Sequence, residues 1–294
     1  MTLCAGKILE AFPSTVVAAG FCLLANCALA DDTPAQPIPG AAHRALPLWE
    51  AGLLGFGYTQ PAYPGADDRT SALLGLPYLV YRGQYLRAER GNVGLRALMT
   101  PRIEMDVGFG ASLGSSSSDV AARRSMPDLG TMIEFGPRLK INLGDVSSGR
   151  SDMRLQFPLR EVIDISDGFR SKGIAFEPQW VIDKRLPDNW LASIDLGALF
   201  GDKELNDTYY GVTPAEATPT RPSYTARSGL IALRAGLFAT HPLSSDVRLI
   251  CTIRVESLAG AANTDSPLVR RNSGWSAGIG LVWVLGRSEQ NAKD

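Results

Sequence analysis

Residues 131–143 read TMIEFGPRLKINL, and this stretch decides the class of fold. Its odd positions are mostly apolar, from Ile133 to Leu143, whereas its even positions include Glu134 and Lys140. Successive side chains of a strand point to opposite faces, so a strand separates the two sets while a helix would mix them. The stretch therefore predicts a β-strand with one apolar and one polar face.

The same alternation recurs along the chain from Trp49 onward. The expected strands cover 49–58, 70–82, 85–90, 93–99, 103–113, 130–143, 152–166, 172–185, 190–201, 228–241, 247–259 and 274–285. No internal repeat is evident, which argues against a propeller or a solenoid. The pattern predicts an all-β fold, an antiparallel up-and-down barrel of about 12 strands (10–12).

The connections between these strands alternate between short and long. The short ones are Gly83-Gln84, Thr100-Pro101, 144–151, 186–189 and 242–246. The long ones are 59–69, 114–129, 202–227 and 260–273, and only 91–92 and 167–171 are short on that side. A transmembrane barrel has short turns on the periplasmic side and longer loops outside, whereas a soluble sandwich has no reason to sort its loops. The sorting predicts a barrel that spans the outer membrane of a Gram-negative bacterium.

Aromatic and charged side chains fit the same interpretation. Aromatic residues would form two girdles, with Trp49, Trp190 and Trp283 at the periplasmic end and Tyr58, Phe169, Phe200 and Trp275 at the outer end. Apolar faces would meet lipid, and polar faces would line the lumen. The main lumen charges expected are Glu104, Asp106, Glu134, Arg138, Lys140, Arg154, Arg160, Glu177, Asp183, Arg254 and Glu256. Both signs occur in similar number, which favours a lumen of ion pairs over a strongly ion-selective pore.

Composition excludes several classes of protein. The chain has 294 residues, 45% of them hydrophobic, and a net charge of -1. This charge offers no basis for binding nucleic acid. The mean hydropathy is close to zero, as strands that mix polar and apolar residues produce and as a helical membrane protein would not.

The first thirty residues resemble a secretory signal peptide. Lys7 precedes an apolar stretch over 16–24, and Ala28-Leu29-Ala30 is a small-residue cleavage pattern. A membrane anchor and a lipoprotein signal ending at Cys27 are the alternatives. We expect a signal peptide over 1–30, a flexible periplasmic lead-in over 31–47, the barrel over 48–286 and a polar tail over 287–294.

A search for chemistry yields no candidate catalytic, cofactor-binding or metal-binding residues. The chain has two histidines, His43 in the lead-in and His241 before a turn. No Gly-x-Ser-x-Gly elbow, His/Cys cluster or phosphate loop accompanies them. We therefore expect a protein that is not an enzyme, with a hydrolase based on His241 or on an unrecognised carboxylate pair as the alternative.

Several loop segments combine turn formers with aromatic anchors. They are Tyr63-Pro64-Gly65 with Asp67 and Asp68, Tyr81-Arg82-Gly83, Tyr209-Tyr210-Gly211 with Val212, and Asp265-Ser266-Pro267. In this order, over Trp49 to Leu285, they resemble the MipA/OmpV family of outer-membrane proteins. Two positions depart from the family pattern: Ala66 stands where serine is common, and the chain continues beyond Trp283 into a polar tail.

The resemblance implies a non-enzymatic role in the outer membrane, in contact with its lipid. Family members have been tied to scaffolding that links a periplasmic murein transglycosylase to a penicillin-binding protein. The resemblance carries over no catalytic residues. A narrow channel for small solutes is the alternative function, since twelve strands can enclose a water-filled lumen.

Overall fold

The structure is a computed structural model that describes residues 47–82, 86–89, 92–95, 98–100, 102–145 and 151–291. The expected signal peptide, His43 and nearly all of the expected lead-in lie outside the described residues, as do Gly83, Gln84 and Pro101. The strands are β1 Trp49–Pro61, β2 Arg69–Arg82, β3 Leu86–Glu89, β4 Asn92–Leu95, β5 Leu98–Met99, β6 Ile103–Ser112, β7 Met132–Asp145, β8 Ser151–Asp164, β9 Arg170–Phe176, β10 Gln179–Arg185, β11 Leu191–Gly201, β12 Gly229–Pro242, β13 Val247–Ser257 and β14 Ser273–Arg287. One α-helix, α2 Lys203–Tyr210, and one short 3-10 helix, Ala121–Arg123, lie in the loops described.

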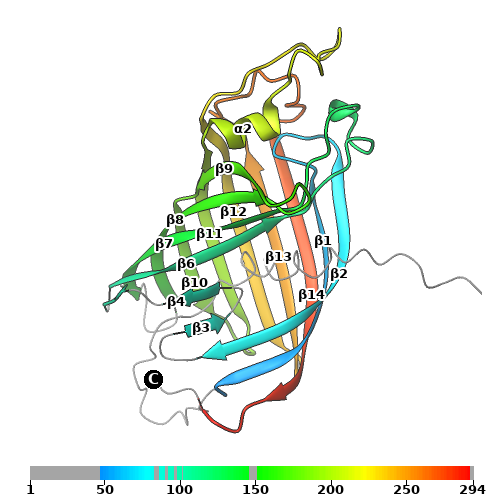
Figure 1. Cartoon of the computed structure of the whole chain (residues 1–294). Helices are drawn as coiled ribbons and strands as arrows, with labels where there is room; N and C mark the ends of the chain where they lie inside the picture. The colour runs from blue at the N-terminus through cyan, green and yellow to red at the C-terminus, as the bar shows by residue number, and fades with distance from the viewer. Residues whose placement is uncertain are drawn as a thin grey trace, which may run out of the picture.

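The described strands form a single antiparallel sheet in which neighbours in space follow one another along the chain. The first and last strands pair, from Glu50 with Arg287 to Thr59 with Ala277. The two ends of the hydrogen-bonded order are β4 and β5, which are consecutive segments of the chain. The sheet therefore returns upon itself as a barrel (Figure 1).

The strand count agrees with the expected one. The sheet has 14 strands, but β4 and β5 are consecutive, and β9 and β10 both pair with β8 and β11. Treating each of these two pairs as one interrupted strand leaves twelve. The prediction of an all-β up-and-down barrel is confirmed.

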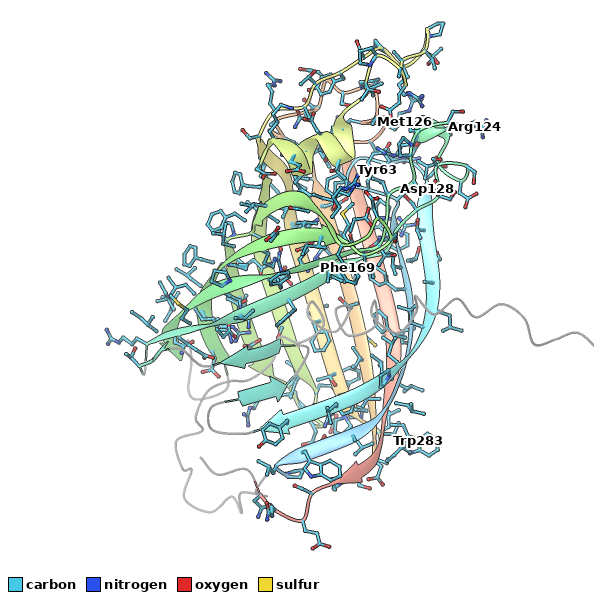
Figure 2. All side chains as sticks on the ribbon, viewed as in Figure 1. Tyr63, Arg124, Met126, Asp128, Phe169 and Trp283 are labelled. Atoms are coloured by element: carbon cyan, nitrogen blue, oxygen red, sulfur yellow. The ribbon has the colours of Figure 1, made fainter. Side chains whose placement is uncertain are left out.

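The faces of the barrel are inverted relative to a soluble protein. Large apolar side chains cover the exterior, with Leu73 87% exposed, while charged side chains are buried inside. In Figure 2, Trp283 projects from the outside of the wall. Closing the sheet satisfies the backbone hydrogen bonds that hydrocarbon would otherwise leave unmade. This is the construction of a transmembrane β-barrel. Within the described part of the chain, none of the helices has the length and apolarity of a membrane span.

The two ends of the barrel differ in their connections. At one end, β10 and β11 are joined by a tight turn in which Asp188 and Asn189 both have positive φ, 57° and 59°. Two-residue hairpin turns of type I′ require such angles, and Asp and Asn tolerate them. Both described chain ends also lie here, where Pro47 bridges to Asn291. Short turns mark the periplasmic end of an outer-membrane barrel, and this end is called the inner end below.

The opposite, outer end carries the long loops and α2, which gather over the barrel mouth (Figure 1). Asp202 caps α2 by accepting a hydrogen bond from the Leu205 amide at 2.9 Å. This helix was not expected from the sequence, although Asp202 is a usable N-cap signal. Eight residues are too few for a clear helical periodicity.

Candidate functional site

The lumen has two unlike walls. The first, called the polar arc, carries the charged side chains of β6 to β13. It consists of Glu104, Asp106, Glu134, Arg138, Lys140, Arg154, Arg160, Glu177, Asp183, Arg234, Arg254 and Glu256. The structure places all of the main lumen charges expected from sequence on this wall. They lie there because the side chains of each strand alternate and the barrel closes with the charged face inward.

Glu177 is the centre of the outer part of the polar arc. Its Oε1 accepts a hydrogen bond from Arg234 at 3.0 Å, and its Oε2 accepts one from Arg160 at 2.5 Å. Arg160 also reaches Glu134 at 3.1 Å, and Arg234 reaches Glu256 at 3.8 Å. These five alternating charges form one chain of ion pairs. Charges buried this deeply need such compensation.

A second group of ion pairs lies nearer the inner end. Arg138 binds Asp106 through two nitrogens, at 2.9 Å and 2.5 Å. Lys140 contacts Asp106 at 3.1 Å and Glu104 at 3.6 Å. A contact through two hydrogen bonds between Arg and a carboxylate stabilises the pair and also fixes the relative orientation of the two groups.

Asp183 makes a separate set of contacts on the same wall. It accepts hydrogen bonds from both Arg154 and Ser193. Ion pairs thus occur in both the outer part and the inner part of the polar arc.

The second wall, called the apolar wall, was not expected. It consists of Leu54, Phe56, Leu76, Tyr78, Val80, Phe238, Ile250, Val282 and Val284. The expectation that polar faces line the lumen is therefore wrong for β1, β2 and β14, whose two faces are both largely apolar.

Tyr58 packs against the apolar wall, so its expected place in the outer aromatic girdle is wrong. Its ring stacks on Phe56 with centroids 5.9 Å apart. Both rings lie against Gly278, where an added Cβ would collide with them. Gly278 has no side chain and so leaves room for the two aromatic rings. This contact joins two strands, so the alternation along a single strand could not reveal it.

The outer mouth is closed by packed loops, called the outer cap: residues 62–68, 113–131, 202–228 and 258–272. A buried apolar cluster that includes Tyr63, Tyr210 and Leu268 lies at this end. The Tyr63 hydroxyl donates to the Leu268 carbonyl at 2.7 Å, and the Ser266 hydroxyl donates to the Tyr210 carbonyl at 2.7 Å. Figure 2 places Tyr63 beside the Met126 loop at this end. Three segments far apart in sequence are therefore joined through buried hydrogen bonds.

These contacts explain most of the loop segments singled out from sequence. Gly65 has φ 89° and accepts a hydrogen bond from the Arg270 amide at 2.8 Å. The Asp68 carboxylate accepts one from the Ala121 amide at 2.7 Å. Pro64, Gly211 and Pro267 lie in the same loops and shape their turns.

Other singled-out residues lie apart from these buried contacts. Asp67 lies 3.9 Å from Arg270, and Asp265 lies 3.8 Å from Arg227, both as exposed pairs. Exposed pairs of this kind contribute little. Tyr81 lies at the inner end, where it pairs with Trp49. Arg82 ends the same strand, whereas Gly83 lies outside the described residues.

Arginines that were not expected from the sequence complete the outer cap. Arg221 donates to the carbonyls of Ala122 and Arg124, each at 3.0 Å. Arg123 donates to the Tyr209 carbonyl at 3.3 Å. Guanidinium groups that bind backbone carbonyls leave no charge-pair pattern in the sequence, so no signal could have identified them.

Burial also changes the acidity of tyrosines in the outer cap. It raises the pKa of Tyr63 to about 12 and that of Tyr209 to about 12. It raises the pKa of Tyr210 as well. These hydroxyls therefore stay protonated, and able to donate hydrogen bonds, at any physiological pH.

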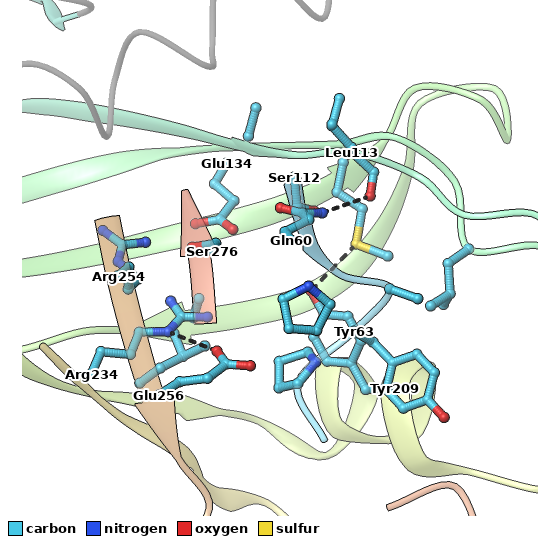
Figure 3. Close-up of a pocket in the computed structure, with 18 of the residues that line it drawn as sticks. Gln60, Tyr63, Ser112, Leu113, Glu134, Tyr209, Arg234, Arg254, Glu256 and Ser276 are labelled. Atoms are coloured by element: carbon cyan, nitrogen blue, oxygen red, sulfur yellow. Dashed lines mark hydrogen bonds and ion pairs between the residues drawn. The ribbon is translucent and has the colours of Figure 1, made fainter. Parts of the chain in front are cut away.

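A chamber of about 120 Å³ lies between the outer cap and the side chains of the lumen (Figure 3). Arg234, Arg254 and Glu256 line one side, and Gln60, Tyr63 and Tyr209 line another. The chamber thus brings together charged residues of the polar arc and aromatic residues of the outer cap.

His241, the residue of the alternative hydrolase reading, stacks on Trp190 with ring centroids 4.7 Å apart. Its Nδ1 has no hydrogen-bond partner in the part of the chain that the structure describes. Among the described residues, no group of three or more His, Cys, Asp or Glu side chains could hold a metal ion.

Comparison with solved structures finds other barrels at low similarity. The NanC porin has 9% identity over 79% of this chain and 99% of its own, with a TM-score of 0.39. The translocator domain of autotransporter NalP from Neisseria meningitidis has 13% identity over 83% and 90%, with a TM-score of 0.37. Outer membrane phospholipase A from Escherichia coli has 11% identity over 79% and 92%, with a TM-score of 0.32. Likenesses this weak do not indicate a function.

Comparison with known sequences identifies the family of this chain but finds no individual curated relative. None of the curated proteins matches the chain. The family model described as MltA-interacting protein MipA matches residues 54–285, which is nearly the whole barrel. The resemblance seen in the loop segments is confirmed: this outer-membrane β-barrel protein belongs to the MltA-interacting protein MipA family.

Proposed function

We propose that this protein is a closed, non-enzymatic barrel that holds murein enzymes at the inner face of the outer membrane. The observation that carries the proposal is the packing of the lumen. Val181 and Ser193 point inward and are 0% exposed. A water-filled pore would leave such side chains in contact with solvent. The family name, which refers to interaction with MltA, supports a partner in cell-wall metabolism.

The alternative of a narrow solute channel has less support. The ion pairs of the polar arc face the apolar wall, and the outer cap lies across the mouth. A solute would have to separate buried ion pairs and displace a packed apolar cluster. Both steps are costly, so a closed barrel agrees better with this geometry.

The inner end offers a surface for a periplasmic partner. Leu186 and Leu243 are exposed there, each in a short turn between two strands. Exposed apolar side chains on rigid turns are suited to protein contacts. We infer that the two leucines belong to the surface that a murein transglycosylase or a penicillin-binding protein contacts.

A capture experiment tests the scaffold role. The barrel in lipid nanodiscs is immobilised and incubated with periplasmic extract, and the bound proteins are identified and assayed on purified murein. We expect a murein transglycosylase and a penicillin-binding protein to be recovered. The double variant L186S/L243S should reduce recovery roughly tenfold, as loss of a contact hot spot does.

The matched control is Phe169→Ser, which removes an exposed aromatic side chain from the outer end. This variant should recover the enzymes as well as the unchanged protein does. Failure of the unchanged barrel to retain any murein enzyme would contradict the scaffold role.

The non-enzymatic part of the proposal has a separate test. Purified barrel and the variant His241→Ala are compared with lipase and esterase substrates. We expect neither to exceed the background of empty nanodiscs. Turnover by the unchanged protein that disappears in His241→Ala would instead establish a hydrolase.

A further inference from the structure

The chamber beneath the outer cap is large enough for a ligand. Its volume is about 120 Å³. One water needs roughly 10–15 Å³ of such space, so the chamber has room for roughly eight to twelve waters. A ligand with a similar number of non-hydrogen atoms would fit.

Arg254 is the arginine of the polar arc that takes part in none of its close ion pairs. It makes no hydrogen bond and no close ion pair with the described residues, and its Nε is buried without a partner. Its charge is balanced only at longer range, by the carboxylates of Asp195 and Glu177. Both oxygens of Glu177 are already taken, by Arg160 and Arg234. In Figure 3 a dashed line joins Arg234 to Glu256, whereas none reaches Arg254. A guanidinium held this way is a ready site for an anion.

Neighbouring groups add donors beside this guanidinium. Ser276 lies directly opposite Arg254 in the β13–β14 pairing, and both side chains line the chamber. The Ser276 hydroxyl makes no hydrogen bond with any described residue. One cation and one hydroxyl can together hold the two oxygens of a carboxylate.

The other part of the chamber is apolar. Phe56 and Tyr58 line it, with their stacked rings held against β14. Aromatic faces of this kind favour an apolar or aromatic body.

We propose that the chamber binds a small monocarboxylate with an apolar body. Its carboxylate would lie between Arg254 and Ser276, and its body against Phe56 and Tyr58. This site is separate from the inner-end surface proposed for murein enzymes, so either proposal can fail without the other.

Benzoate is the probe, because it has nine non-hydrogen atoms, one carboxylate and an aromatic body. Equilibrium dialysis of radiolabelled benzoate against the barrel in nanodiscs measures binding, and slow entry past the outer cap does not affect an equilibrium value. We expect saturable binding of one benzoate per barrel. Unlabelled benzamide, which has the same shape and no charge, should compete at least roughly tenfold more weakly.

Variants locate the site. Arg254→Gln should weaken benzoate binding at least roughly tenfold. The matched control is Arg248→Gln, on the same strand and the same face but not in the chamber lining. This control should bind as the unchanged protein does. Ser276→Ala, a small change that leaves the ion pairs intact, should weaken binding roughly threefold.

Three results would overturn the proposal: no saturable binding by the unchanged barrel, equal binding by Arg254→Gln, or equal loss in Arg248→Gln. The first result would mean that the chamber holds only water. If Arg254→Gln does not fold, Ser276→Ala decides, and unchanged affinity in that variant overturns the site.

Discussion

The polar arc and the apolar wall share one barrel, one strand period and one lumen, yet they are held by different forces. Ion pairs centred on Glu177 fix the polar arc, and each pair requires a particular partner at a particular register. The apolar wall is held by non-directional packing around Leu54 and Phe56. Each wall includes side chains that are almost fully buried, such as Glu177 and Leu54. A barrel lumen can therefore be filled either by paired charged side chains or by packed apolar ones.

The largest effect should come from removing the centre of the polar arc. Glu177→Gln leaves Arg160 and Arg234 buried without their shared carboxylate. Breaking a buried ion pair in this way costs about 3–5 kcal/mol of unfolding free energy. Urea titration of the barrel in liposomes, followed by tryptophan fluorescence, measures the loss. The control is Glu204→Gln, an exposed residue on α2, which should change the free energy by less than about 0.5 kcal/mol. Equal stability of Glu177→Gln and the unchanged protein would show that the ion pairs of Glu177 do not stabilise the polar arc.

A smaller effect should come from the apolar wall, and adjacent residues provide the test. Leu54 is 2% exposed in the lumen, whereas Leu53 is 51% exposed on the lipid side. Leu54→Ala should cost about 2–4 kcal/mol, because it leaves a cavity as well as losing transfer energy. Leu53→Ala should cost clearly less, since lipid can fill the vacated space. The same titration measures both, and a reversed order would show that the lumen and lipid faces of β1 are misassigned.

A third, smaller effect concerns the outer cap. Tyr63→Phe removes the hydroxyl that donates to Leu268 and leaves a buried carbonyl without its donor. The loss should be about 1–2 kcal/mol. Protease digestion of intact cells at the outer loops, or hydrogen exchange of the Leu268 region, should report a looser outer cap. The strand amides of the barrel serve as the internal control and should keep their protection.

The smallest effect is the pH dependence that Tyr63 contributes. Its pKa is raised from 10.0 to about 12 in the folded protein, so the folded state holds the proton more tightly than the unfolded state does. Stability is therefore unaffected below about pH 10 and falls as the pH rises from about 10 through 12. At pH 11 the contribution of this one tyrosine is about 1 kcal/mol. Thermal unfolding of the unchanged protein and of Tyr63→Phe between pH 8 and 12 should show a shallower decline in the variant, and parallel declines would contradict the assignment.

The sequence predicted the polar arc far better than the apolar wall, for a physical reason. On β7, Glu134 and Lys140 alternate with Ile133 and Leu143, so the two faces differ and the period of two is visible. On β2, Leu74 and Leu76 face the lumen while Leu73 and Leu79 face lipid, so no alternation marks the inner face. Alternation detects a strand only where its two environments select different side chains.

The outer cap illustrates a second limit. The sequence marked Tyr63, Tyr210 and Ser266 as unusual because they occur in turns with a family resemblance. It could not show that they meet, because the contacts join loops about 60 to 200 residues apart. Barrel closure, which brings β1 beside β14, is what places these loops together.

Single-channel recording in planar lipid bilayers tests the central claim of a closed lumen most directly. We predict that the purified, folded barrel produces no steady conductance. A variant that lacks residues 213–225 of the outer cap should also conduct little, because the packed lumen below remains. Stable, ohmic currents through the unchanged protein would contradict a closed barrel and would favour a channel.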